Sequence, residues 1–249
     1  MTEDKKFSNN ILIDIQNLQK SFNGFQVLKK IDLKVKKGET VVTLGKSGSG
    51  KSVLLKCIVC LIYPDSGIIK VLGKDMTALP PNELQHIRKR IGFIFQGGAL
   101  YDSMSVKENL IFPLVRHLSL DKNQIEQRVH DVLESVDLLD SINKMPSELS
   151  GGMRKRIGLA RTLILNPEIM LWDEPTTGLD PATSKEICHL ILKMQEKYNV
   201  TSIVVTHDIP CAKLVADRIV VLKGGIFTEE GSFGELENSK DEFVKSFFE

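Results

Sequence analysis

Hydrophobic residues recur along the chain as short runs, separated by longer stretches with helical spacing. Alternation at Ile11, Ile13 and Ile15, and again from Val27 to Val35, predicts strands with one partly wetted face. Short apolar runs predict buried strands at 40–44, 68–71, 91–95, 169–174, 202–206 and 219–222. The stretches between them predict helices, including 53–58, 80–88 and 181–197. This succession of strands and helices favours an α/β fold with a parallel, doubly wound core behind a small antiparallel sheet.

Between residues 97 and 165 the periodicity becomes helical, as at Ile125, Val129 and Val132. We therefore expect a single domain over 1–249 with three parts. Its core, including the β subdomain, comprises 11–96 and 166–231; the inserted helical subdomain is 97–165; and the C-terminal tail is 232–249. The tail contains a predicted helix whose phenylalanines either pack on the core or contact another subunit.

Composition places the chain among ordinary globular proteins. Its 249 residues are 42% hydrophobic and 26% charged, which suits one large α/β domain. The formal net charge of +1 gives no electrostatic case for a nucleic-acid partner, so we expect none. The polar segment 1–6 lacks the apolar centre of a signal peptide, and no run approaches the roughly 18 apolar residues of a spanning helix. These features predict a soluble protein.

Cysteine usage points to a reducing compartment. The four cysteines form no disulfide framework. Cys57 and Cys60 are spaced as C-x-x-C, but they fall on the apolar helix at 53–58 and its end. We interpret them as small buried hydrophobic residues rather than as a metal or redox pair.

The strongest local pattern is a glycine-rich loop between the strand at 40–44 and the helix at 53–58. Such a loop brings backbone N–H groups close to phosphate oxygens, and the helix N-terminus adds a positive dipole end. Lys51 is placed to reach the β- and γ-phosphates, and the Ser52 hydroxyl to ligate Mg²⁺. A plain Gly/Ser-rich turn does not require this complete spacing. The predicted nucleotide contacts are Gly45, Lys46, Ser47, Gly48, Ser49, Gly50, Lys51 and Ser52.

Polar residues follow the other apolar strands, at the edge where open parallel sheets bind ligands. Asp173 is expected to bind Mg²⁺ and Glu174 to deprotonate the attacking water. His207 is expected to contact the γ-phosphate and that water, and Gln96 to reach Mg²⁺ or the water. Phe22 is our choice for stacking on the nucleotide base, although a plain core aromatic suits its position nearly as well.

A second phosphate-binding pattern lies within the helical segment. Ser150 is placed to cap the helix that follows, and Gly151 and Gly152 leave the backbone open to a phosphate. If this segment forms a separate lobe, its helix start lies away from Lys51 of the same chain. The pattern therefore favours a dimer of two copies that holds two ATP molecules between them.

Together these residues closely resemble the nucleotide-binding subunits of ABC transporters. The Walker A motif is 45–52, the Q-loop residue is Gln96 and the signature is 149–152. Walker B is 169–173 followed by Glu174, the D-loop ends at Asp180 and the switch histidine is His207. The resemblance implies the P-loop NTPase ABC ATPase fold, with a RecA-like core, an antiparallel β subdomain and an inserted helical subdomain. It also implies ATP hydrolysis coupled to transport, with Glu174, His207, Gln96 and Lys51 as catalytic residues, and adds Asp180 to the nucleotide site.

A finer resemblance concerns the segment 95–106, the following Glu108-Asn109, and Met153 after the signature. These features are similar to the ATPase subunits of Mla/MCE-type lipid transporters. They imply an integral membrane permease, an MCE-domain lipid-binding protein, and a phospholipid or other hydrophobic cargo. The chain would then lie at the cytoplasmic face of the inner membrane, held there by the permease. The alternatives are an ABC transporter ATPase for another cargo, such as amino acids or lipoproteins, and a soluble non-transport ABC ATPase.

Overall fold

The computed structural model describes residues 10–248, so the polar segment 1–6 lies outside the described residues. The strands are β1 (Ile11–Phe22), β2 (Phe25–Lys36), β3 (Thr40–Leu44), β4 (Ser66–Val71), β5 (Lys74–Asp75), β6 (Ile91–Ile94), β7 (Ile169–Asp173), β8 (Thr201–Thr206), β9 (Arg218–Lys223) and β10 (Ile226–Gly231). The helices are α2 (Lys51–Ile58), α3 (Pro81–Arg88), α4 (Val106–His117), α5 (Lys122–Ser135), α6 (Gly151–Leu163), α7 (Pro181–Tyr198), α8 (Ile209–Val215), α9 (Phe233–Glu237) and α10 (Glu242–Lys245). Two 3₁₀ turns, η1 (Leu139–Ser141) and η2 (Pro146–Glu148), precede α6.

All ten strands form one mixed sheet in the order β5-β4-β1-β2-β10-β9-β3-β8-β7-β6. Strands β9, β3, β8, β7 and β6 run parallel to one another, which confirms the predicted parallel core. Strands β1, β2, β4 and β5 pair antiparallel, as expected for the small sheet ahead of the core. Strand β10 pairs antiparallel with β9 and meets β2 in parallel, and thereby joins the two parts.

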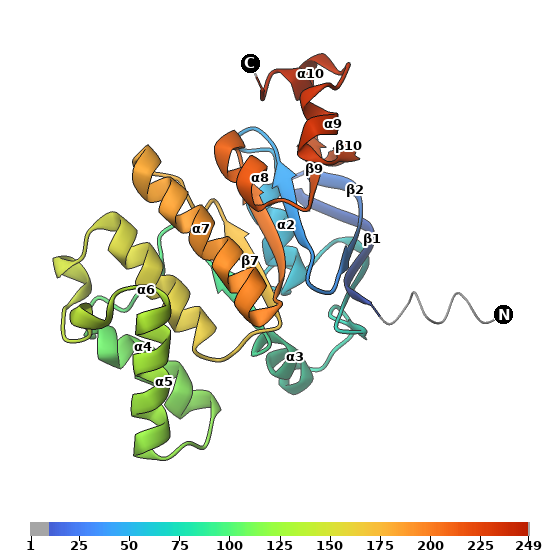
Figure 1. Cartoon of the computed structure of the whole chain (residues 1–249). Helices are drawn as coiled ribbons and strands as arrows, with labels where there is room; N and C mark the ends of the chain where they lie inside the picture. The colour runs from blue at the N-terminus through green and yellow to red at the C-terminus, as the bar shows by residue number, and fades with distance from the viewer. Residues whose placement is uncertain (1–9, 249) are drawn as a thin grey trace.

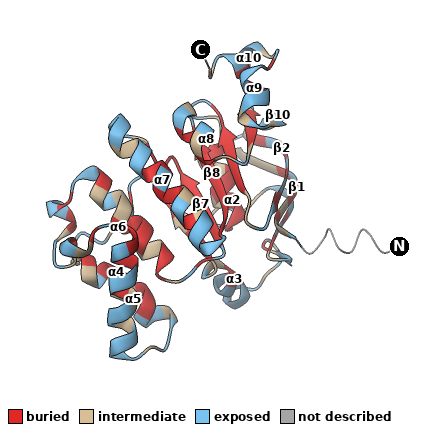
Figure 2. Cartoon of the chain, in the orientation of Figure 1, coloured by how far each residue is buried: buried red, intermediate tan, exposed pale blue. Residues whose placement is uncertain are grey.

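The parallel strands are buried on both faces because alternate side chains enter different hydrophobic cores. Val41 and Leu171 belong to the core that includes α2, whereas Val42 and Trp172 belong to the core covered by α7 and α8. Figure 1 shows α7 in front of the sheet and α2 behind it. In Figure 2 the buried residues accordingly follow the central strands β7 and β8. This double burial explains the almost uninterrupted apolar runs in the sequence.

Helices α4, α5 and α6 lie together beside the parallel strands (Figure 1). Their apolar residues, such as Leu110, Val129 and Ile157, belong to the same core as Trp172, so this core continues from the helices to the sheet. The helical spacing seen between residues 97 and 165 therefore corresponds to real helices. The division of the chain into core, helical and tail parts stays a prediction.

Some predicted boundaries hold in the structure and others shift. The signature helix keeps its predicted start: Ser150 caps it by accepting a hydrogen bond from the Met153 N–H at 3.2 Å, and the helix begins at Gly151. Strand β7 ends at Asp173, since Glu174 adopts a left-handed conformation with φ of 50°. Strands β5 and β10 were not predicted. β5 is an edge strand of two residues, and β10, although it lies inside the sheet between β2 and β9, is largely polar and lacks a clear apolar alternation.

The C-terminal tail forms two short helices rather than one. Val244 of α10 is fully buried, and Phe243, Phe247 and Phe248 pack against the core that α7 and α8 cover. Of the two alternatives left open by the sequence, the structure supports packing on the core.

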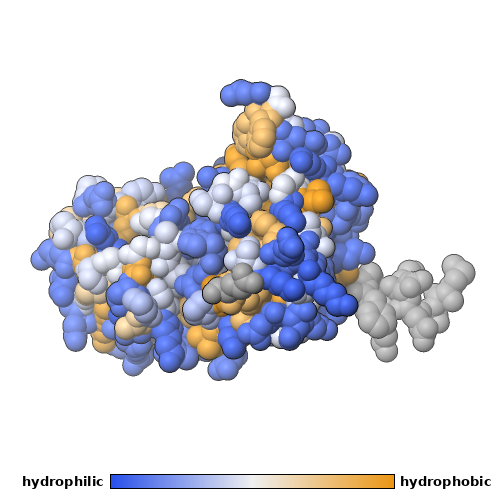
Figure 3. Space-filling model, turned by 90° about the horizontal axis from the view of Figure 1, so that it is seen from above, coloured by the Kyte–Doolittle hydropathy of each residue, from blue (hydrophilic) through white to orange (hydrophobic). Residues whose placement is uncertain are grey.

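The exposed surface carries no continuous apolar belt on the face seen in Figure 3, where hydrophobic residues form patches within a largely hydrophilic surface. Within residues 10–248, no helix combines the length and apolar character needed to cross a membrane.

Asn109 organises the loop between Gln96 and α4. Its side chain is fully buried, its Oδ1 accepts from the Tyr101 N–H at 2.8 Å, and its Nδ2 donates to the carbonyl oxygens of Tyr101 and Met104 at 3.1 and 2.9 Å. One fully buried amide thus pairs with the backbone of Tyr101 and Met104 and holds the loop in shape.

We predict that Asn109→Ala lowers the free energy of unfolding by about 1–3 kcal/mol, because it removes a fully buried amide together with its hydrogen bonds to the backbone of the loop. Chemical denaturation measures the change. Asn238→Ala is the matched control, since Asn238 is exposed and donates to the Gly234 carbonyl; its expected effect is within about 0.5 kcal/mol. Equal effects of the two substitutions would contradict the structural role of Asn109.

Candidate functional site

The loop from Gly45 to Ser52 joins β3 to α2 and has the backbone that a phosphate cradle requires. Gly50, at the N-cap of α2, has a φ of 103°, which favours glycine. A Cβ at Gly45 would lie 2.6 Å from Ser49 Oγ and 3.0 Å from the Leu222 carbonyl oxygen. Glycine is therefore required at position 45 by close packing and at position 50 by backbone conformation.

Lys51 is the first residue of α2, and its side chain reaches back into this loop, where it is only 5% exposed. Its Nζ donates to the carbonyl oxygens of Gly45 at 2.6 Å and Lys46 at 3.2 Å, and lies 3.1 Å from Glu174 Oε1. An ammonium group has three donors, so the loop and one carboxylate satisfy all of them. The cation is thus held where phosphate oxygens would approach the loop.

Ser52, the next residue, connects α2 to the end of β7. Its hydroxyl donates to Asp173 Oδ1 at 2.6 Å, and Asp173 is buried. A hydroxyl and a carboxylate oxygen side by side are ligands of the kind that Mg²⁺ prefers. The pair therefore fits the metal site predicted for these two residues.

Glu174 is held by contacts on several sides. Its Oε2 lies 2.9 Å from His207 Nδ1 and accepts from the Thr177 hydroxyl at 3.2 Å. Its backbone N–H donates to the Val205 carbonyl of β8 at 2.9 Å. A left-handed backbone at a non-glycine residue is uncommon and persists only where surrounding contacts determine it. The structure therefore fixes the carboxylate beside Lys51 and His207.

Most of these groups line one open cleft of about 410 Å³. Phe22 and Gln96, both predicted site residues, lie on its wall, although Gln96 follows β6 by two residues instead of one. The lining residues are Phe22, Val27, Ser47, Gly48, Ser49, Gly50, Lys51, Ser52, Val53, Gln96, Glu174, Thr177 and His207.

Several predicted residues lie outside this lining, among them Gly45 and also Asp173, which accepts a hydrogen bond from the lining residue Ser52. The Lys46 ammonium is 5.2 Å from the ring centroid of Phe243 in the tail, a cation–π contact. Asp180 caps α7, and hydrogen bonds from the Thr183 side chain and backbone lower the pKa of its carboxyl. The signature residues 150–152 are also absent from the lining, which agrees with the expectation that they lie apart from their own loop.

Sequence reasoning missed two residues near the cleft. Thr177 lines the cleft, and its hydroxyl donates to the Glu174 carboxylate. Lys155 of α6 donates to the carbonyl oxygens of Pro175 and Thr177, at 2.8 and 2.6 Å. Its position one helical turn after the signature is the only sequence signal that marks it.

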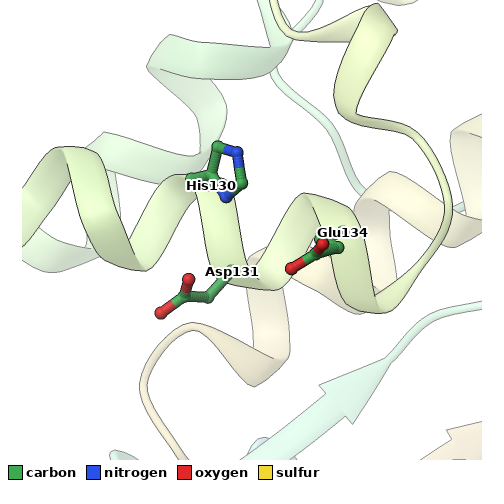
Figure 4. A group of neighbouring side chains, drawn as sticks. All are labelled: His130, Asp131 and Glu134. Carbon is green, nitrogen blue, oxygen red and sulfur yellow. The ribbon is translucent and has the colours of Figure 1, made fainter.

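Other candidate sites carry less chemistry. On α5, ligand atoms of His130, Asp131 and Glu134 lie within 4.8 Å of one another (Figure 4), the only such group among residues 10–248. All three residues are exposed on one helix, and we interpret them as a solvated face.

The four cysteines are free and buried, and burial raises the pKa of the Cys57 thiol to about 12. The prediction that Cys57 and Cys60 are small buried hydrophobic residues is confirmed.

Comparison with known proteins agrees with this geometry. The family described as ABC transporter matches residues 28–177. The chain is 41% identical over 225 residues to the methionine import ATP-binding protein MetN of Clostridium acetobutylicum, covering 90% of this chain and 70% of that protein. It is 39% identical over 229 residues to MetN 1 of Bacillus cereus, covering 90% and 66%. The chain therefore spans about two thirds of the length of these relatives.

Solved structures show the same fold. The ATP-binding cassette MJ0796, in a dimeric post-hydrolysis state bound to ADP and Pi, has a TM-score of 0.82 and 34% identity, covering 89% of this chain and 98% of that one. The protein cbiO1 from Clostridium perfringens, part of the ABC transporter complex cbiONQ, has a TM-score of 0.85 and 30% identity, covering 95% and 94%.

The fold and the cleft define a P-loop protein that binds a nucleoside triphosphate. Within that class the chain belongs to the ABC transporter family: it is an ATPase with the ABC ATPase fold.

The buried pairing of Lys51 with Glu174 yields a stability prediction. Lys51→Met leaves the Glu174 carboxylate without its cation, and should lower the free energy of unfolding by about 3 kcal/mol. In a Glu174→Gln background, the loss of stability caused by Lys51→Met should be smaller by about 1–3 kcal/mol, because the two residues are coupled. Denaturation in the absence of nucleotide gives both numbers.

The exposed pair of Arg90 and Glu168 supplies the control. Arg90→Met should change stability by at most about 1 kcal/mol, as is usual for solvated pairs. Strictly additive effects of the Lys51 and Glu174 substitutions would show that the two charges do not depend on each other.

Proposed function

We propose that this chain hydrolyses ATP at the cleft beside the loop 45–52 and supplies the energy for a membrane transporter whose channel is a separate polypeptide. The observation that carries the proposal is the contact of the Lys51 ammonium with both the loop and Glu174, beside the Ser52–Asp173 pair. One cation, one metal-ligating pair and one carboxylate base are the parts that phosphoryl transfer to water requires.

The loop and Lys51 bind the phosphates, and the N-terminus of α2 adds its positive dipole end. Ser52 and Asp173 would hold Mg²⁺, with Gln96 reaching it from the cleft wall; when bound, the ion neutralises charge on the phosphate oxygens. Phe22, which is 41% exposed on the same wall, offers its ring to the nucleotide base.

Glu174 accepts the proton of the attacking water, since its carboxylate faces the cleft and is oriented by neighbours. His207, whose Nδ1 is 2.9 Å from this carboxylate, orients it and offers the rest of its exposed ring to the γ-phosphate and water. The Thr177 hydroxyl holds the carboxylate from a second side.

Two copies of the chain act together in this proposal. Ser150 and Gly151 are exposed at the N-terminus of α6, a suitable place for a phosphate, yet they do not line their own cleft. The similar cassette MJ0796 is dimeric, with ADP and Pi bound. We therefore infer that each nucleotide is held by the loop of one copy and the signature of the other, with Asp180 near the contact between the copies.

A separate permease follows from the assignment to transport. Both MetN relatives are named as import ATP-binding proteins, and residues 10–248 contain no membrane-spanning helix. We place the chain on the cytoplasmic face of the membrane, held there by the permease. The segment after Gln96 is our choice for the permease contact, since it joins the cleft to the helices.

For the cargo we propose methionine or a similar small amino acid. The relatives at 41% and 39% identity are methionine import proteins, which supports the amino-acid alternative over the lipid interpretation. A hydrophobic lipid remains a second candidate because the segment 95–106 and Met153 resemble Mla/MCE-type ATPases. An MCE-domain partner belongs only to this second candidate, and neither MetN relative supports it.

Glu174→Gln tests the base. The amide keeps the polar contacts but cannot take a proton, so turnover should fall by about 10²–10⁴-fold while ATP binding persists. Steady-state phosphate release and equilibrium binding of a fluorescent ATP analogue measure the two quantities. Glu83→Gln, on exposed α3, is the matched control and should leave turnover unchanged. Near wild-type turnover of Glu174→Gln would exclude this residue as the base.

The same variant tests the two-copy arrangement. Glu174→Gln should accumulate as an ATP-bound dimer during size-exclusion chromatography with ATP. Adding Ser150→Arg should prevent that dimer, because a long cationic side chain would obstruct the helix start. A dimer that persists with Arg at position 150 would place the nucleotide contacts elsewhere.

Cargo is tested in the native cell. A strain whose only copy carries Glu174→Gln should lose uptake of labelled methionine, whereas a strain with Glu83→Gln should retain it. The distribution of labelled phospholipid between membranes is measured in parallel. Normal methionine uptake together with altered phospholipid distribution would reverse the order of the two candidates.

A further inference from the structure

Lys155 links the signature helix to the loop behind Glu174. It lies on α6, five residues after Ser150, and its ammonium donates to the carbonyl oxygens of Pro175 and Thr177 at 2.8 and 2.6 Å. These two acceptors belong to the first three residues after Glu174. The contact therefore joins the helical part of the chain to the segment that presents the carboxylate.

The surroundings of Lys155 favour a specific contact over a loose surface one. The side chain is half-buried, and it lines a small apolar cavity with Trp172, Pro175 and Ile187. Burial lowers the pKa of the Lys155 ammonium, while the charge of Glu174 raises it. An ammonium that has lost part of its water gains from each carbonyl oxygen that replaces it.

The acceptor Thr177 is itself bonded to Glu174. Its hydroxyl donates to Glu174 Oε2 at 3.2 Å, and its backbone N–H donates to the Glu174 carbonyl at 3.3 Å. The Glu174 backbone has a φ of 50°, a conformation that surrounding contacts must maintain. Lys155, Thr177 and Glu174 thus form a continuous chain of hydrogen bonds from α6 to the cleft.

We propose that Lys155 is a positioning residue for ATP hydrolysis, which fixes the loop 175–177 and through Thr177 orients the Glu174 carboxylate. This inference rests on the proposed role of Glu174 as the base. Among the residues that the structure describes, Thr177 is the only residue of the cleft lining to which the Lys155 ammonium donates a hydrogen bond, and none goes to the loop 45–52. Lys155 therefore acts on the orientation of the base and not on binding of the phosphates.

The position of Lys155 has a consequence for the two-copy arrangement. Ser150 and Lys155 are on one rigid helix, so a displacement of α6 at its first turn also moves the Lys155 ammonium. When the signature of one copy closes on the nucleotide of the other copy, the movement of α6 would therefore shift Glu174 of the copy that supplies the signature. Lys155 thereby couples the two sites through α6.

Lys155→Met tests the proposal, because it keeps the apolar stem and removes the ammonium. The kcat for ATP hydrolysis should fall by about 10²-fold, the order expected when a reacting group is displaced by about 1 Å. The KM for ATP and the affinity for a fluorescent ATP analogue should stay within about 3-fold, since the phosphate contacts are intact. Lys155→Arg can donate to both carbonyl oxygens and should retain kcat to within about 5-fold.

Lys193→Met is the matched control. Lys193 lies on α7 and also donates to a backbone carbonyl, that of Ser135 at 3.3 Å, but it does not contact the loop 175–177. Its kcat should match the wild type. An equal loss of kcat in Lys193→Met, an unchanged kcat in Lys155→Met, or a failure of Lys155→Arg to restore turnover would each overturn the proposal.

Thr177→Val provides the second measurement and removes the hydroxyl that reaches Glu174. Because both residues act through one chain of hydrogen bonds, the double variant with Lys155→Met should lose little more kcat than the worse single variant. Multiplicative losses would overturn the proposal. Glu174→Gln distinguishes failure of this inference from failure of the proposed function. If Glu174→Gln abolishes turnover and Lys155→Met does not, only the role of Lys155 is wrong. If Glu174→Gln remains active, the proposed function itself is wrong.

Discussion

The architecture of the site depends on a pair of opposite charges held almost out of water. The Lys51 ammonium lies 3.1 Å from Glu174, and both side chains are largely buried. A buried charge without a partner is costly, so both groups must reach the same place in the folded chain. The sheet order β3-β8-β7-β6 achieves this, because the loop after each strand opens at the same edge. The site residues therefore lie at the ends of four strands that are neighbours in the sheet. Lys51 follows β3, His207 follows β8, Asp173 and Glu174 stand at the end of β7, and Gln96 follows β6.

The helical part of the chain adds a second level to this arrangement. Helix α6 is capped by the exposed Ser150 and shares a hydrophobic core with the sheet through Ile157 and Trp172. Through Lys155 it also reaches the loop 175–177 that follows Glu174. One helix thus joins the end that we propose binds the nucleotide of a second copy to the carboxylate that we propose as the base. This connection fits the proposal that hydrolysis depends on the closure of two copies.

The sequence indicates the nucleotide-binding site more strongly than it indicates the cargo. Phosphoryl transfer demands particular groups at particular places, so 45–52, Asp173 and Glu174 identify it directly. In the proposed transporter a membrane partner would select the cargo, so a resemblance limited to the segment 95–106, Glu108-Asn109 and Met153 carries less information. Relatives named for methionine import therefore outweigh that resemblance. Asn109, one of its residues, instead has a clear structural task in closing the loop 101–105.

The sequence by itself determined the local elements and the chemistry attached to them. The loop 45–52 needs glycine at Gly50 for a left-handed backbone, and strands buried on both faces read as apolar runs, so both were predictable. Tertiary structure alone decided the strand order, the contact of Lys46 with Phe243, and the tasks of Thr177 and Lys155. The physical reason is range: periodicity and glycine report on neighbours along the chain, whereas a hydrogen bond such as that from Ser52 to Asp173 joins residues 121 positions apart.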